Sequence, residues 1–208
     1  MATKQKTYFL LKIKLMHTKI PVWRKFYVPA DIQLRKLHIA IQIVMGWTNS
    51  HMHEFKFEGL TFIPNEVFEE DDGYGKSLPE GNLKLNTFIS RKGDSFIYNY
   101  DMGDYWQHKI TLENADYKKE EENSALCIDG KGTCPPEDVG SVEGFEHFCE
   151  VINNPKDEEY LDLKKWAYEF CDYPNDMKWP DGFNISEVNK IFKSIFKPRK
   201  SKKKISSD

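Results

Sequence analysis

The sequence predicts an α+β fold: a mostly antiparallel, roll-like sheet with helices packed on one side, and a helical C-terminal third. Three observations carry this prediction. Apolar residues occupy every second position in several segments before residue 113, which is typical of strands with one buried face. One helical stripe, with apolar residues three and four apart, interrupts those segments. Three more helical stripes follow residue 140, and strands followed by helices are the pattern of an α+β domain.

Two strands open the chain, at residues 8–15 and 22–28. Alternation of apolar and more polar side chains runs through both segments, as on a strand that buries one face. Residues 17–20 form a short connection between them, so the two strands are predicted to make a hairpin.

A helix follows at residues 34–45, where Leu34, Leu37 and Ile41 begin its apolar stripe. Asp31 is expected to cap its N-terminus, because a carboxylate can accept hydrogen bonds from the free amides of a first turn. Gly46 is expected to end it in the left-handed conformation.

The middle of the chain is predicted to form a third strand, a long loop and a hairpin. His51, His53 and Phe55 share one face of the third strand, and residues 60–63 form a short partner. Residues 64–82 are acidic and rich in Gly and Pro, which predicts a loop rather than a regular element.

The hairpin joins strands at residues 96–100 and 106–112 through the turn of residues 101–104. Gly103 is expected to take a positive φ in that turn. The acidic stretch from residue 114 to residue 133 is predicted to be irregular.

Helical stripes then begin at Phe145, Tyr160 and Ile185. Asn184 with Glu187 three residues later resembles a capping box at the start of the last helix.

One domain is predicted, over residues 5–196, followed by a basic tail at residues 197–208 that is too polar to bury and is expected to be disordered. Charge is uneven along the chain. Residues 1–63 hold ten Lys or Arg against three Asp or Glu, whereas residues 113–150 hold eleven acids against three bases. Such halves could pair with each other or attract an anionic partner.

Composition excludes some classes of protein. An aromatic content of 14% predicts a packed core rather than disorder. The densest apolar run, Ile39–Met45, is too short for a membrane span, and no secretory signal is recognised, so a cytoplasmic protein without membrane contact is expected. Its four cysteines are expected to be reduced, and mostly buried or inert.

Three histidines form the first candidate site. His51, His53 and His108 could together hold zinc with an open position for water. However, His53 shares its face with aromatic residues, and His108 lies next to Trp106 on the last long strand. A histidine in such surroundings is more often a core residue with one hydrogen bond, and the sequence favours that interpretation.

Four carboxylates form the second candidate site. Asp101 and Asp104 flank a tight turn, and Glu137 and Asp138 follow Pro135-Pro136, so magnesium could bind if the two loops converge. Turn geometry and the start of a helix explain the same residues, and this structural role is favoured. No metal or cofactor is therefore predicted, and no phosphate loop, nucleophile elbow or dinucleotide fingerprint is present.

Several segments, in this order along the chain, match a known family pattern. They are Val22–Lys25, Leu34 with Leu37-His38, Ile41-Gln42, Met45–Trp47, His51–Phe55, Tyr98–His108 and Cys134–Gly140. Over residues 5–195 the chain resembles the Ri-plasmid open-reading-frame-three-like family, whose members also occur as passenger proteins of insertion sequences.

The resemblance implies a compact α+β roll but no particular activity. Some members carry a resolvase label, which is not transferred because no recombinase active site is recognised here. Family members often have two glycines after the Pro-Pro-Glu-Asp segment, where this chain has Gly140-Ser141. Six candidate residues lie in the matching segments: Asp101, Asp104, Trp106, His108, Glu137 and Asp138.

Two functional hypotheses follow, and whether the protein is an enzyme stays open. The favoured one is a non-enzymatic binding module for a protein or nucleic acid, which rests on the basic first third, the basic tail and the resemblance to mobile-element passengers. The alternative is a metal-assisted hydrolase that uses His51, His53, His108, Asp101 and Asp104. The partner is not identified, and a monomer is assumed.

Overall fold

The computed structural model describes residues 7–70, 77–118, 125–171, 173–174 and 177–196. It confirms the predicted α+β class: one eight-stranded sheet in the order β5-β4-β3-β6-β7-β1-β2-β8, antiparallel at every pair except β4–β5. The strands are β1 (Tyr8–Leu15), β2 (Trp23–Pro29), β3 (His53–Phe57), β4 (Leu60–Ile63), β5 (Ser77–Pro79), β6 (Ser95–Tyr100), β7 (Trp106–Asn114) and β8 (Leu126–Lys131).

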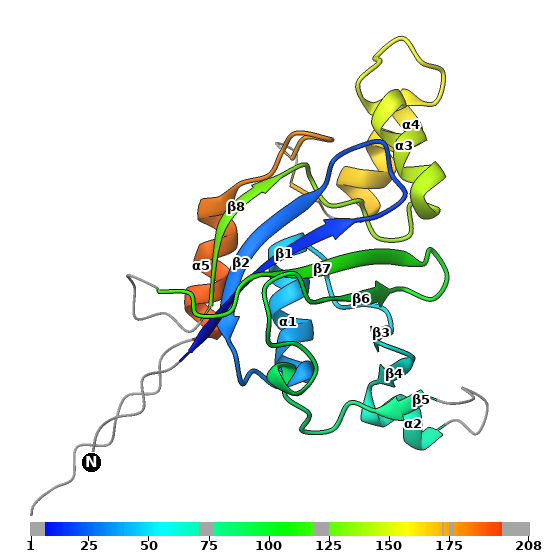
Figure 1. Cartoon of the computed structure of the whole chain (residues 1–208). Helices are drawn as coiled ribbons and strands as arrows, with labels where there is room; N and C mark the ends of the chain where they lie inside the picture. The colour runs from blue at the N-terminus through cyan, green and yellow to red at the C-terminus, as the bar shows by residue number, and fades with distance from the viewer. Residues whose placement is uncertain (1–6, 71–76, 119–124, 172, 175–176, 197–208) are drawn as a thin grey trace, which may run out of the picture.

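Five α-helices accompany the sheet in the described parts of the chain. They are α1 (Leu34–Met45), α2 (Asn65–Glu70), α3 (Ser141–Ile152), α4 (Tyr160–Lys165) and α5 (Ile185–Ile195). A π-helical turn, Trp166–Phe170, continues α4. As Figure 1 shows, α3 and α4 stand together at one end of the molecule, while α5 lies beside β8. No helix in the described segments has the length and apolar character needed to cross a membrane.

The core lies between the inner face of the sheet and α1. Leu11 and Ile13 of β1 and Phe26 of β2 are fully buried, as are Leu37 and Ile41 on the apolar stripe of α1. The intervening residues of the strands point to the outer face, where the side chains are mostly polar. The alternation in the sequence therefore separates the two faces as expected.

A buried guanidinium ties the C-terminus of α1 to the sheet. Arg24 of β2 donates hydrogen bonds to the carbonyl oxygens of Val44 at 2.8 Å and of Lys131 at 2.7 Å, and stacks on the Phe183 ring at 3.8 Å. A cation is favourable at the C-terminal end of a helix, where carbonyls lack partners. Burial lowers the Arg24 pKa to about 10, so the side chain stays charged at neutral pH.

Both outer strands of the sheet are modified at their free edges. β5 is three residues long and ends at Pro79, which has no backbone N–H. At the other edge, the side-chain amide of Asn189 in α5 accepts from the Cys127 N–H and donates to the Cys127 carbonyl, both at 2.9 Å. Asn189 thus binds one residue of β8 as a neighbouring strand would.

The start of α1 differs from the prediction. Asp31 does not cap it, because the helix begins at Leu34 after Gln33, whose side chain makes no capping hydrogen bond. Gln33 instead forms an isolated β-bridge with Lys84, and the Leu34 N–H donates to the Leu83 carbonyl at 2.9 Å. The free amide at the start of α1 is therefore hydrogen-bonded by a segment distant in the sequence rather than by a capping side chain. The expected stop at Gly46 is confirmed, with φ of 104°.

Two segments expected to be irregular contain regular structure. Residues 64–82 hold α2 and β5, and residues 114–133 hold β8. Both strands exist through pairing with distant partners, β5 with β4 and β8 with β2, which local sequence does not reveal. The Asp129-Gly130 pair in β8 resembles a turn, but both residues pair with β2, next to a register shift between Cys127 and Asp129.

The C-terminal prediction holds where the structure describes it. The Asn184 side chain accepts from the N–H groups of Ser186 and Glu187, which confirms the N-cap of α5. Three cysteines are buried, and burial raises the pKa of Cys127 to about 11 and of Cys149 to about 12. The predicted disordered tail, residues 197–208, lies outside the described residues.

Candidate functional site

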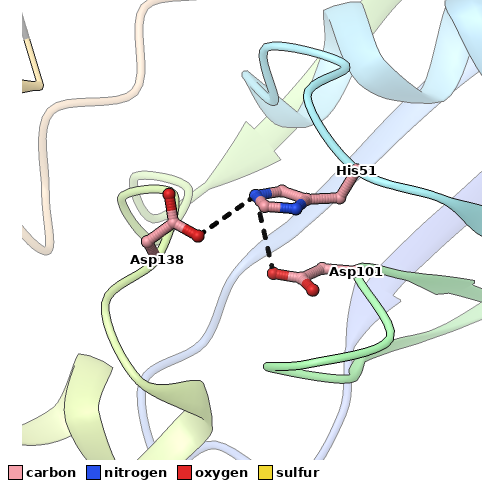
Figure 2. A group of neighbouring side chains, drawn as sticks. All are labelled: His51, Asp101 and Asp138. Carbon is pink, nitrogen blue, oxygen red and sulfur yellow. Dashed lines mark ion pairs between the residues drawn. The ribbon is translucent and has the colours of Figure 1, made fainter.

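Three segments far apart in the sequence bring one imidazole and three carboxylates together, where β3 begins and β6 ends. His51 Nε2 lies 3.2 Å from Asp138 Oδ1, 3.7 Å from Asp101 Oδ2 and 3.8 Å from Glu137 Oε2. Figure 2 shows Asp101 and Asp138 pointing toward the same ring nitrogen. We call His51, Asp101, Glu137 and Asp138 the His51 cluster.

Asp101 is placed by the turn that follows β6. Its φ of 61° is in the left-handed region, where an L-residue is strained but Asp is tolerated. Asp101 Oδ1 accepts the Gly103 N–H at 2.8 Å, which leaves Oδ2 directed at His51. Gly103, expected to supply the positive φ of this turn, does not; Asp101 and Tyr105 do. Asp101, one of these two strained residues, is therefore also the one whose side chain faces His51.

Glu137 is held by three donors on one of its oxygens. Oε1 accepts from the Thr48 N–H at 2.7 Å, the Thr48 hydroxyl at 2.8 Å and the Tyr100 hydroxyl at 3.1 Å. The other oxygen, Oε2, is buried and has no hydrogen-bond partner among the described residues. Since Glu137 is only 8% exposed, this free oxygen faces the cluster rather than bulk water.

The Tyr100 hydroxyl links the loop that carries His51 to Glu137 through hydrogen bonds. Its hydroxyl oxygen accepts from the N–H groups of Ser50 at 2.9 Å and His51 at 3.3 Å while the hydroxyl donates to Glu137. Burial, and then the charge of Glu137, raise the Tyr100 pKa above its ordinary value. The phenol therefore remains a donor at neutral pH.

Asp138 and Asp104 have different roles in the neighbouring loop. Asp138 is 73% exposed in its side chain and takes a φ of 56°. Asp104 Oδ2 accepts the Gly140 N–H at 3.0 Å, so it binds the N-terminal end of α3 from another segment. The acidic loops thus converge, and Asp104 binds a backbone amide of the other loop, 36 positions away, rather than the nearby amides of its own turn.

His53 lies in a separate polar network. It comes two residues after His51, yet β3 begins only at His53, and the two rings occupy different surroundings. His53 Nε2 is 3.2 Å from Glu80 Oε2, and its ring stacks on His38 with centroids 3.6 Å apart. The predicted arrangement of His51 and His53 as a pair on one strand face is therefore wrong.

In this second network, both ring nitrogens of His38 have a hydrogen-bond partner. Its Nδ1 lies 2.8 Å from the Tyr98 hydroxyl and its Nε2 lies 2.6 Å from Asn49 Oδ1. Because an amide oxygen only accepts, Nε2 carries the proton, and Nδ1 accepts from Tyr98. Burial, and then His53, lower the His38 pKa to about 3, so the ring is neutral.

His108 and Trp106 are core residues. The Trp47 indole N–H donates to His108 Nε2 at 3.4 Å, and His108 Nδ1 lies 3.3 Å from the Tyr98 carbonyl. Burial lowers the His108 pKa to about 4. Trp106 is fully buried beside Trp47 and Phe145. Neither residue contacts the His51 cluster in the described structure.

Of the eight predicted candidates, the structure brings together four: His51, Asp101, Glu137 and Asp138. Thr48 and Tyr100, which orient Glu137, were not predicted, because their partner lies 89 and 37 positions away. The structure also contains a cavity of about 350 Å³ between α1 and α2, but no predicted site residue lines it.

The composition of the His51 cluster suits a divalent cation. Three carboxylates crowded around one ring repel one another unless a positive charge lies between them. Ligand atoms of His51, Asp101 and Asp138 all lie within 4.8 Å of one another. A mixed set of imidazole nitrogen and carboxylate oxygen is typical of Mn²⁺, Fe²⁺ and Zn²⁺ sites, whereas Ca²⁺ prefers oxygen alone.

Comparison with known proteins gives a consistent picture. The profile of a family described as plasmid pRiA4b ORF-3-like protein matches residues 7–184. The chain is 34% identical over 182 residues to the uncharacterized protein y4hQ of Sinorhizobium fredii, covering 86% of this chain and 88% of that protein. A crystal structure of the protein of unknown function MM3350 from Methanosarcina mazei Go1 superposes with a TM-score of 0.74 at 30% identity, covering 89% of this chain and 99% of that one.

A partial similarity also exists to cytochrome P450 2M1 of Oncorhynchus mykiss, at 26% identity over 147 residues. It covers 29% of that protein and carries no argument about function.

Proposed function

This chain belongs to the plasmid pRiA4b ORF-3-like family, and on that premise we propose that its fold carries a divalent-cation site formed by His51, Asp101 and Asp138. Glu137 lies beside these ligands as a fourth carboxylate. The names of the family, of y4hQ and of MM3350 assign no activity, so the proposal rests on the geometry of the cluster.

One observation supports the proposal above the others. Glu137 Oε2 is buried and has no hydrogen-bond partner among the described residues, and it faces His51 Nε2 at 3.8 Å. His51 Nε2 also makes no hydrogen bond there, and its nearest partner is the carboxylate of Asp138 at 3.2 Å. Leaving a buried polar atom unpaired costs about 1–3 kcal/mol. An ion among these atoms would give His51 Nε2 a ligand bond and would offset the charge of the unpaired Glu137 oxygen.

The spacing of the ligands agrees with such an ion. Zinc binds nitrogen and oxygen at about 2.0–2.2 Å, so two ligands of one ion lie roughly 3–4 Å apart. The distances from His51 Nε2 to Asp138 and Asp101 are 3.2 and 3.7 Å. The strained backbone at Asp101 and Asp138 is also common at sites where function fixes a side chain.

The chemistry open to this site is hydrolysis. Because the Asp138 side chain is mostly exposed, an ion held there would keep a position open to water. A bound cation would lower the pKa of such a water toward neutrality, and Glu137 would be the acceptor of its proton. This supports the metal-assisted hydrolase hypothesis, with His51 as its one histidine. The hypothesis of a binding module without enzymatic activity stays a prediction.

Metal titration of the full chain tests the proposal. We expect one Mn²⁺ or Zn²⁺ per chain by isothermal titration calorimetry. At a free-ion concentration of about 100 times Kd, binding should raise Tm by roughly 5–11 °C, since it adds about 2.7 kcal/mol and each kcal/mol shifts a domain of this size by about 2–4 °C.

Asp138→Asn should weaken binding at least tenfold without loss of folding, because its side chain is mostly exposed. Asp116→Asn is the matched control, as Asp116 is an exposed aspartate that contacts only Lys118 among the described ion pairs. Equal metal affinity in the wild type and Asp138→Asn, or no bound metal in either, would refute the site.

A further inference from the structure

The outer face of the sheet carries a line of basic residues that is separate from the His51 cluster. Strand registers place Lys56 of β3 opposite Ile97 of β6, Ile97 opposite Lys109 of β7, and Lys109 opposite Lys14 of β1. The line continues from Lys14 to Trp23 of β2 and to Lys131 of β8. We call these six residues the lysine row. Strands lie about 4.8 Å apart, so the row extends roughly 24 Å.

The row faces away from the helices of the core. On β1, Ile13 and Leu15 flank Lys14 and are buried, whereas Lys14 is exposed; on β7, His108 and Ile110 flank the exposed Lys109 in the same way. Lys131 is also exposed, and Trp23 is half-buried. The row is therefore available to a partner.

The charges of the row are poorly balanced within the protein. In the described segments, no ion pair within 4.0 Å joins Lys14, Lys109 or Lys131 to a carboxylate. Lys14 and Lys109 are also directly opposite, an arrangement that destabilises a sheet. The adjacent pair, Lys12 and Lys25, repeats it, and there Glu113 neutralises Lys25 at 3.0 Å. The excess positive charge thus lies in the middle of the row.

An aromatic ring lies within this positive strip. Trp23 stands between Lys14 and Lys131, and the Lys12 ammonium is 5.0 Å from its ring centroid. Aromatic platforms beside lysines are how proteins bind single-stranded nucleic acids: phosphates contact the cations while bases stack on the ring. A duplex offers no unpaired base for stacking, and its grooves admit a helix or a two-stranded ribbon rather than the flat face of a wide sheet.

We propose that the lysine row binds single-stranded nucleic acid, with the phosphates on Lys14, Lys109 and Lys131 and a base stacked on Trp23. Lys56 contributes less, because it pairs with Glu54 at 2.7 Å. An acidic peptide or an anionic lipid surface would share the cations but would make little use of the indole. Trp23 therefore distinguishes these partners.

Fluorescence anisotropy with a labelled oligothymidine of about 20 nucleotides, titrated with the full chain at several salt concentrations, tests this proposal. We expect binding that weakens as salt rises. Lys14→Ala with Lys109→Ala should lower the slope of log K against log salt by about 1.4, since each phosphate contact to a single strand adds about 0.7. Trp23→Ala should weaken binding roughly 5- to 100-fold.

The matched control is Lys36→Ala with Lys193→Ala, which removes two exposed lysines from α1 and α5. It should leave the slope unchanged, and because the C-terminal basic residues remain in every variant, the difference isolates the row. Equal slope losses in both double variants, or equal affinity for the oligothymidine and its duplex with oligoadenine, would refute the proposal. The proposal would also be refuted if anionic vesicles or polyglutamate bound as tightly as the oligothymidine and if Trp23→Ala left their binding unchanged.

Discussion

At the scale of single residues, the position of His51 relative to His53 decides what the site is. Alternation in the sequence placed both rings on one strand face, but β3 starts at His53, and the preceding loop turns His51 toward the carboxylates. The loop does so because Asn49 contacts His38 while Ser50 and His51 contact Tyr100. These contacts join segments distant in the sequence, which explains why local pattern could name His51 as a candidate but could not place it.

Tyr100 offers the sharpest test at this scale. Tyr100→Phe removes one donor from Glu137 Oε1 and the acceptor of two backbone amides. We expect a loss of about 1–3 kcal/mol in unfolding free energy and a 10- to 100-fold weaker affinity for the metal, because partners that orient ligands tune metal binding. Urea unfolding and calorimetric titration would measure the two effects.

Tyr105→Phe is the control on the same hairpin, since that hydroxyl contacts Lys56, Asn99 and Glu54 rather than the His51 cluster. If Tyr100→Phe bound the ion as tightly as Tyr105→Phe, Tyr100 would have no part in positioning the site.

At the scale of elements, local signals and tertiary contacts contributed differently. The stop of α1 at Gly46 and the Asn184 cap of α5 were predicted correctly, because each depends on neighbouring residues. The strands β5 and β8 were missed, because each is defined by its pairing partner. The sequence could give the convergence of the two acidic loops only as a condition for metal binding. Whether they converge depends on how the turn at residues 101–105 packs against the loop at residues 134–140.

Arg24 links three of these elements, and its replacement tests how much that link contributes. Arg24→Lys keeps the charge, but one ammonium cannot reach all four carbonyls that the guanidinium contacts, on Trp23, Val44, Met45 and Lys131. We expect a loss of about 2–4 kcal/mol, because hydrogen bonds from a charged group contribute about 1.5–3 kcal/mol each and carbonyls are left unpaired.

Urea unfolding would measure this loss, with Arg35→Lys on the exposed side of α1 as the control. A change below 0.5 kcal/mol, the ordinary range of surface substitutions, would show that the guanidinium does not hold α1 to the sheet.

At the scale of the whole molecule, the uneven charge of the sequence becomes partly self-complementary. Lys25 pairs with Glu113 at 3.0 Å and Lys19 with Glu146 at 2.9 Å, so the basic first third contacts the acidic middle of the chain. Ion pairs that are still partly open to solvent, such as these two, contribute little to stability. These pairs neutralise Lys19 and Lys25, whereas the lysine row keeps its positive charge on the outer face.

The buried imidazoles make the stability of the whole fold depend on pH. Burial lowers the pKa of His108 from 6.5 to about 4, so the unfolded chain binds more protons than the folded one between these values. Stability therefore falls as pH drops from about 6.5 toward 4, and His108 alone accounts for about 2 kcal/mol of that fall by pH 5.

Urea unfolding at pH 7 and pH 5 would measure this dependence in the wild type and in His108→Gln, which can still bind Trp47 and the Tyr98 carbonyl. The variant should lose about 2 kcal/mol less than the wild type over this interval. The same loss in both proteins would mean that His108 is not held neutral by burial.

The ends of the sheet also have a consequence for behaviour at high concentration. An exposed edge strand is a template for another chain, and long flat edges promote aggregation. Here one edge is three residues long and closes on Pro79, and at the other the amide of Asn189 already occupies both backbone groups of Cys127. A ninth strand from a second molecule would therefore meet a very short edge on one side and, on the other, an edge already bound by Asn189 at Cys127.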